Sequence, residues 1–179
     1  NSVDIAYNKL DKKLKATCDN HIAVLVGGDT KNQKLEGKSS FKLIDELKRI
    51  SKIFELNLVI TCSRRTPQTL YNDLKSFNIL ETEKNLNPYP GMLKNAKIII
   101  VTSDSVNMIS EALSLGHPVI LFDLIKLEGR KKRFVENLIK NKYLLYSSEL
   151  INKNQLNKIT YQPLSEAKRV GQILRRKIH

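Results

Sequence analysis

Cysteine is almost absent from this 179-residue sequence, which contains only Cys18 and Cys62. Two cysteines make no disulfide framework, and such a composition is typical of proteins kept in a reducing cytosol. Long apolar runs are missing too: the longest have about five or six residues, far fewer than the ~20 of a membrane-spanning helix. The first residues also lack the charged and then apolar pattern of a signal peptide. We therefore expect a cytoplasmic protein without a membrane span.

Motifs for metal binding and covalent catalysis are missing as well. The three histidines, His21, His117 and His179, are scattered, and no set of His, Cys and Asp has the spacing of metal ligands. His117 precedes a proline and is interpreted as a turn residue. No Gly-x-Ser-x-Gly elbow and no Cys-His arrangement indicates a nucleophile. The sequence thus predicts no metal site and no cofactor, and it identifies no catalytic residue.

Acidic residues are few relative to basic ones. The 31 Lys and Arg against 18 Asp and Glu give a formal net charge of +13, which attracts nucleic acid, anionic membranes and phosphorylated ligands alike. The basic residues are spread over nearly every predicted helix, without the interleaved aromatic residues of a base-stacking surface. A specific nucleic-acid partner is therefore not expected, whereas peripheral attachment to the inner face of a membrane stays open.

The apolar residues that are present form short runs separated by helical patterns. The runs lack in/out alternation and are rich in β-branched residues, which is typical of strands covered on both faces. Five are strong, at 22–26, 57–61, 97–101, 118–122 and 143–146, and a weaker sixth lies at 77–81. Helical patterns lie at 40–54, 66–77, 105–116, 130–142 and 165–177, with Thr66 and Pro67 as cap and first residue of the second.

Strands that alternate with helices at this spacing predict an α/β fold, a doubly wound parallel sheet of the Rossmann-like type. We expect one domain over residues 18–179, preceded by a polar lead-in segment or linker at 1–17. Because the sequence begins with Asn1 rather than Met, it is interpreted as a processed product or a piece of a longer protein.

Ligands of doubly wound sheets bind where strands end and loops lead into helices. After the first strand, Gly27 and Gly28 either let backbone amides approach a ligand or form a plain strand-to-loop pair. The loop has no Gly-Lys-Ser/Thr ending, so it is not a Walker loop.

After the second strand, Ser63, Arg64 and Arg65 precede a helix. The arginines can bind phosphate, or one is exposed while the other pairs with an acid.

Two further loops carry candidate residues. In "NPYPGML" (87–93), two prolines are expected to stiffen a turn around Tyr89, which either stacks on a base or plugs the loop. In "TSDSVN" (102–107), a helix that begins at Ser105 presents free amides and a positive dipole end to an anion. Glu111 follows about one and a half turns later, where it can bind a diol such as ribose. The alternative is an ordinary helix, capped by Asp104 or Ser103.

The quoted words now resemble a known family. "GGDTK", "TCSRRTPQ", "NPYPGMLKNAKIIIVTSDSVNMISEALSLGHPVILF" and "KKRF" occur in this order over residues 20–145. They resemble the Elm-type family, which is named for a plant mitochondrial-fission protein and has bacterial members. That family is in turn similar to the C-terminal half of GT-B glycosyltransferases and of UDP-N-acetylglucosamine 2-epimerases.

The resemblance implies a site for a nucleotide-diphosphate sugar. In the similar proteins an Asp-Ser-Gly-Gly…Glu-Glu-Ala segment binds the nucleotide, and here Asp104 and Ser105 match its start and Glu111 its end. Ser105 and the amides that follow would hold the diphosphate, and Glu111 the ribose hydroxyls. The remaining candidates would flank the base or neutralise phosphate: Asn87, Tyr89, Met92, Arg64, Lys132 and Arg133, with Gly27, Gly28, Ser63 and Arg65 lining the same cleft.

Two departures limit what the resemblance implies. The paired glycines of the motif are Val106 and Asn107 here, which leaves less room for a pyrophosphate. Nothing in the sequence corresponds to the N-terminal, acceptor-binding half of a GT-B protein. We therefore expect the metal-independent donor-binding half of a GT-B-like glycosyltransferase, inactive without an N-terminal acceptor domain. The alternatives are a non-catalytic interaction module with a degenerate cleft, or a basic binder of polyanions or membrane surfaces.

Overall fold

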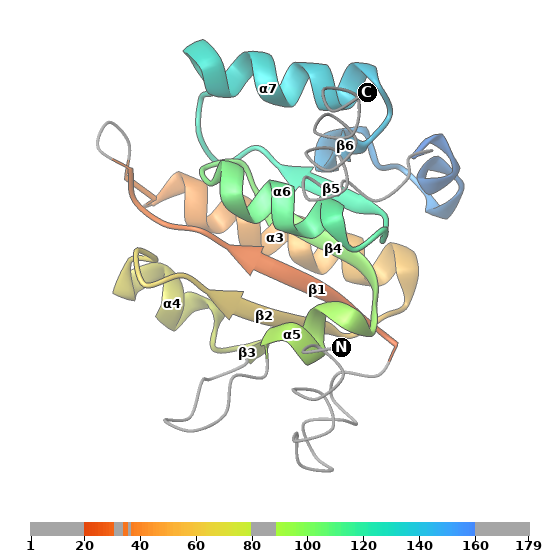
Figure 1. Ribbon diagram of the computed structural model, residues 1–179. Helices are drawn as coiled ribbons and strands as arrows, with labels where there is room; N and C mark the ends of the chain where they lie inside the picture. Colours follow the sequence, from red (N-terminus) through yellow and green to blue (C-terminus); the bar gives the residue numbers. More distant parts are fainter. Residues whose placement is uncertain (1–19, 31–33, 36, 80–88, 160–179) are drawn as a thin grey trace, which may run out of the picture.

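A parallel β-sheet organises the computed structural model, which describes residues 20–30, 34–35, 37–79 and 89–159. The strands are β1 (His21–Val26), β2 (Leu58–Cys62), β3 (Asn78–Ile79), β4 (Ala96–Thr102), β5 (Val119–Phe122) and β6 (Leu144–Tyr146). They form one six-stranded sheet in the order β3-β2-β1-β4-β5-β6, with every neighbouring pair parallel (Figure 1). This is the strand order of a Rossmann fold, whose topological switch point lies between β1 and β4.

β1 is the centre of the sheet, and all six of its residues are buried. It pairs with β2 on one edge, where Ile22 lies opposite Leu58, and with β4 on the other, where Ile22 lies opposite Ile98. Successive side chains of a strand point to opposite faces, so the β1 residues divide between two hydrophobic clusters. The absence of polar alternation in the sequence of this strand follows from this two-sided burial.

The first face of the sheet is covered by α3 (Lys38–Phe54) and α4 (Gln68–Leu74). Leu43, Leu47 and Ile50 of α3 recur at helical spacing and are fully buried against β1, β4 and β5 residues. Two 3-10 helices, η1 (Ser147–Glu149) and η2 (Lys153–Lys158), follow β6. Leu150, between them, packs into the same cluster.

The second face is covered by α5 (Tyr89–Lys94), α6 (Val106–Ser114) and α7 (Gly129–Lys140). Ile109 and Leu113 of α6 and Val135 of α7 are fully buried in the second cluster. In Figure 1, α3 lies behind the sheet and α6 in front of it. The predicted doubly wound α/β sheet is therefore confirmed, and each of the five strong strands lies within one residue of its predicted bounds.

Two predicted elements were wrong in detail. Pro67 does not begin α4 as a first helical residue: its ψ of 143° is extended, and it occupies the N-cap position without a side-chain cap. The Thr66 hydroxyl bonds the carbonyl of Gly27 at 2.6 Å instead of capping the helix. The "YPGMLK" segment is not a turn but helix α5. Proline is tolerated in a first helical turn, and burial of Met92 and Leu93 holds the helix on the sheet.

The expected lead-in at 1–17 and the expected helix at 165–177 lie outside the described residues. None of the helices in the described part of the chain combines the length and the hydropathy that a membrane span requires.

Candidate functional site

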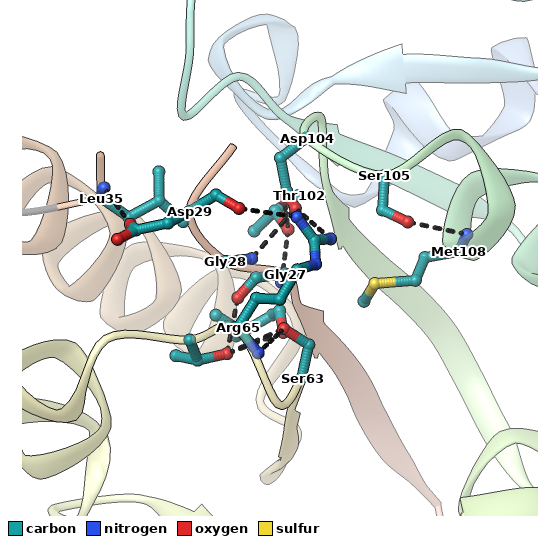
Figure 2. Close-up of polar contacts among 12 residues, drawn as sticks. Gly27, Gly28, Asp29, Leu35, Ser63, Arg65, Thr102, Asp104, Ser105 and Met108 are labelled. Atoms are coloured by element: carbon teal, nitrogen blue, oxygen red, sulfur yellow. Dashed lines mark hydrogen bonds and ion pairs between the residues drawn. The ribbon is translucent and has the colours of Figure 1, made fainter. Parts of the chain in front are cut away.

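The loops that follow β1, β2 and β4 meet at the switch point, and Asp104 ties them together. Its carboxylate accepts hydrogen bonds from the Gly28 amide at 3.0 Å and from the Thr102 hydroxyl at 2.6 Å. The Arg65 guanidinium lies 3.3 Å from the same carboxylate, whose side chain is fully buried. Figure 2 shows these groups converging on Asp104. Asp104 therefore neither caps α6 nor faces solvent: its carboxylate joins three loops into the floor of the site.

The paired glycines are required by this packing. A Cβ on Gly27 would lie 2.0 Å from the Asp104 carboxylate, and one on Gly28 would lie 2.1 Å from the backbone of Arg65. Both amides are already engaged, that of Gly27 with the Thr102 hydroxyl at 2.8 Å and that of Gly28 with Asp104. The interpretation that these amides bind a ligand is thus corrected: glycine is needed here because two loops approach closely.

The two arginines after β2 have different environments. Arg65 pairs with Asp104 and also donates to the carbonyl of Asp29 at 2.8 Å, while its amide bonds the Ser63 hydroxyl at 3.2 Å. About half of the Arg65 side chain nevertheless stays exposed. Arg64 is exposed beside it. This is the predicted alternative in which one arginine pairs with an acid and the other faces solvent.

Helix α6 begins directly above this floor. Ser105 is its N-cap, and the Ser105 hydroxyl accepts from the Met108 amide at 3.4 Å (Figure 2). Val106 and Asn107 occupy the first two helical positions, whose amides have no acceptor within a helix. Asn107 is exposed and Val106 is half-buried. The helix dipole adds positive potential at this end, so the first turn can accept an anion even though Ser105 also caps it.

Glu111 lies further along α6 and is held by Tyr89 from α5. The Tyr89 hydroxyl donates to one Glu111 carboxylate oxygen at 2.9 Å. Burial is the largest of the causes that raise the pKa of Tyr89, followed by the charge of Glu111 and the hydrogen bond to it. The phenol therefore remains a hydrogen-bond donor at neutral pH. Glu111 itself is exposed, and a carboxylate with one bound oxygen retains acceptor sites for a ligand.

A lysine that the sequence analysis missed reaches the site from α7. The Lys131 ammonium donates to the backbone carbonyl of Asp104 at 2.5 Å. Lys132, which was a candidate, instead lies 3.8 Å from Glu136 on the outer side of the same helix, and Arg133 is exposed. Lys131 shares the i, i+4, i+7 stripe of the buried Val135 and Leu138. Its position on this buried stripe is the sequence signal that would have identified Lys131 as a candidate.

Two other candidates do not form part of the site. Met92 is fully buried in the second hydrophobic cluster, so its assignment to a base-flanking position is corrected to a core residue. Asn87 lies outside the described residues. Among the described residues, no group of three or more His, Cys, Asp or Glu side chains is arranged to hold a metal ion.

The strand order and the parallel pairing define a Rossmann-like α/β domain, and comparison with known proteins identifies its family. The chain belongs to the mitochondrial fission ELM1 family, whose sequence profile matches residues 2–178. It is 35% identical over 162 residues to the uncharacterized protein RP120 of Rickettsia prowazekii (strain Madrid E), covering 86% of this chain and 45% of that protein.

Among solved structures, the chain is similar to a putative UDP-N-acetylglucosamine 2-epimerase from Listeria monocytogenes. The TM-score is 0.63 and the sequence identity 16%, and the match covers 96% of this chain and 49% of that one. At this identity the likeness concerns the fold. In both comparisons the chain spans about half the length of its relative.

Proposed function

We propose that this chain is the donor-binding half of a GT-B-like glycosyltransferase and binds a nucleotide-diphosphate sugar without a metal ion. The observation that carries the proposal is the first turn of α6, which opens at the switch point between β1 and β4. Arg65 and Lys131 both contact Asp104, the residue before its N-cap, and Arg64 is exposed beside Arg65. Positive side chains and free amides together favour a diphosphate.

The proposal assigns different parts of the ligand to different groups. The amides of Val106 and Asn107 bind the diphosphate, and the flanking cations neutralise its charge. Glu111 accepts hydrogen bonds from the two ribose hydroxyls, and Tyr89 fixes the orientation of its carboxylate. Stabilisation of the departing nucleoside diphosphate would fall to this half of the enzyme. The acceptor would come from a second domain, as the half-length matches suggest.

Thermal-shift measurements with UDP, GDP, ADP, TDP, CMP and their sugar conjugates test this proposal, and UDP is the first choice because the similar epimerase is named for a UDP-sugar. A nucleotide present at a hundred times its Kd adds about 2.7 kcal/mol to the stability of the folded state. In a domain of this size the melting temperature should then rise by roughly 5–10 °C.

Glu111→Ala should abolish most of that rise, because it removes the ribose acceptor. Glu136→Ala is the matched control, since Glu136 is an exposed carboxylate on α7 whose contact is Lys132. Addition of a chelator should leave the rise in melting temperature unchanged, because the proposed binding uses no metal ion. Unshifted melting curves with every nucleotide at millimolar concentration would reject donor binding and favour the interaction module instead.

A further inference from the structure

A cavity of about 190 Å³ lies at the same edge of the sheet as the proposed nucleotide site, but on the face covered by α3. Its walls are Lys42, Glu46 and Arg49 of α3, Phe122 and Asp123 at the end of β5, and residues 146–148 after β6. None of these residues takes part in the nucleotide site proposed above. The volume is larger than one water or ion needs and smaller than the 300–1,000 Å³ of sites for drug-sized ligands.

Arg49 makes one wall rigid. Its guanidinium binds both carboxylate oxygens of Glu46, at 2.9 and 2.5 Å, and donates to the carbonyls of Ser147, at 2.8 Å, and Leu150. These bonds hold η1 against α3 across about 100 residues of sequence. A fork of this kind uses most of the five donors of an arginine, so Arg49 shapes the cavity rather than offering a free charge to a ligand.

Asp123 provides an acceptor on the opposite wall. One of its oxygens accepts from the Ser103 hydroxyl at 3.2 Å, which leaves the other oxygen for a ligand. Burial raises the pKa of the Asp123 carboxyl, against the opposing effects of the Ser103 hydrogen bond and the positive charge of Lys42. Burial also raises the pKa of the Tyr146 phenol, helped by the charge of Asp123. The protonated Tyr146 hydroxyl is therefore a hydrogen-bond donor near the Asp123 carboxylate, which is an acceptor.

The charges of the lining select against a charged ligand. Two basic side chains, Lys42 and Arg49, and two acidic ones, Glu46 and Asp123, face this small space. Because Arg49 and Glu46 pair with each other, an anion would meet the charge of Asp123 and a cation would meet that of Lys42. A neutral ligand that carries several hydroxyl groups avoids both penalties, because each hydroxyl can donate to a carboxylate and accept from an ammonium or a phenol.

From the size and the charge balance of this cavity, we infer that it is a binding site for a single monosaccharide ring. The polar groups of the lining fix the orientation of the sugar through its hydroxyl groups. The site is separate from the nucleotide site, although Ser103 and Asp104 are adjacent in the chain. The inference does not depend on the proposed donor function.

Two-dimensional ¹H–¹⁵N spectra of the full chain test it directly, with glucose, galactose, mannose and N-acetylglucosamine as probes. We expect at least one D-sugar at millimolar concentration to shift the amides of Lys42, Asp123, Ser147 and Ser148. The L-enantiomer of that sugar should cause shifts at least about tenfold smaller, because a binding site built from L-amino acids distinguishes enantiomers. Non-specific exclusion of polyols from the protein surface does not depend on handedness, so it would affect the spectra equally with both.

Asp123→Asn should weaken this binding about tenfold or more, since it removes the charged acceptor and keeps the shape. Asp45→Asn is the matched control, because Asp45 is an exposed carboxylate on α3 that does not line the cavity. Tyr146→Phe gives a second, more conservative test in case Asp123→Asn perturbs the fold. Glu111→Ala should leave sugar binding unchanged, which separates this site from the nucleotide site.

Four outcomes would overturn the inference. The first three are equal shifts from both enantiomers, sugar binding that survives both Asp123→Asn and Tyr146→Phe, and the absence of shifts with any free sugar. Shifts at these amides with a UDP-sugar, but with neither UDP nor the free sugar, would also overturn it. The cavity would then belong to the donor site and would not be a separate saccharide site.

Discussion

Gly27 has no room for a methyl group, because the Asp104 carboxylate occupies the space that a Cβ would take. Gly27→Ala should therefore displace Asp104 and lower the free energy of unfolding by about 1–3 kcal/mol, the usual cost of overpacking a filled site. Urea denaturation measures this loss.

A double variant tests the cause of that loss. Adding Asp104→Ala opens the space, so the double variant should be less destabilised than the sum of the two single variants. Additive losses would show that the destabilisation by Gly27→Ala does not come from its contact with Asp104.

At the scale of single elements, strands were the easiest to predict. Runs such as "IAVLV" must be buried on both faces, so composition alone identifies them. The helix α5 was missed because Pro90 and Gly91 are turn residues by local preference, and only the burial of Met92 and Leu93 against the sheet overrides that preference.

The candidate site was predictable in place but not in its contacts. The rule that ligands bind where parallel strands end located the loops of Gly27, Arg65 and Asp104 correctly. The network among them joins residues that are 36 to 76 positions apart in the chain, and no local pattern encodes such contacts. Thr102, to which the sequence analysis gave no role of its own, links Gly27 to Asp104.

The first turns of α7 offer a matched pair of lysines. Lys131→Met should lower the free energy of unfolding by about 1 kcal/mol, because it removes a hydrogen bond to the Asp104 carbonyl. Lys132→Met should change it by less than about 0.5 kcal/mol, as expected for an exposed pair with Glu136. Urea unfolding curves of the two variants make the comparison. Equal losses would mean that Lys131 does not hold the loop before α6.

At the scale of the whole molecule, the net charge of +13 produces its own binding behaviour. Affinity for RNA or heparin should collapse between low and moderate salt, by about 10³–10⁵-fold for six to ten phosphate contacts. Affinity for a nucleotide at α6 should fall far less and should depend on Glu111. Titrations of both ligands at two salt concentrations measure the difference. RNA binding that survives moderate salt would contradict a purely electrostatic interaction and would indicate specific contacts to the nucleic acid.

The central position of β1 has a consequence for how the chain is made. β1 needs a partner on each edge, and Gly27, just after it, lies 75 residues before its partner Thr102 at the end of β4. At about 5–20 residues per second, a ribosome takes roughly 4–15 s to synthesise that interval. During this time one edge of a strand that is apolar from residue 22 to residue 26 has no native neighbour, and an unpaired apolar edge is a template for aggregation. The nascent chain is therefore a natural client for chaperones until β4 emerges.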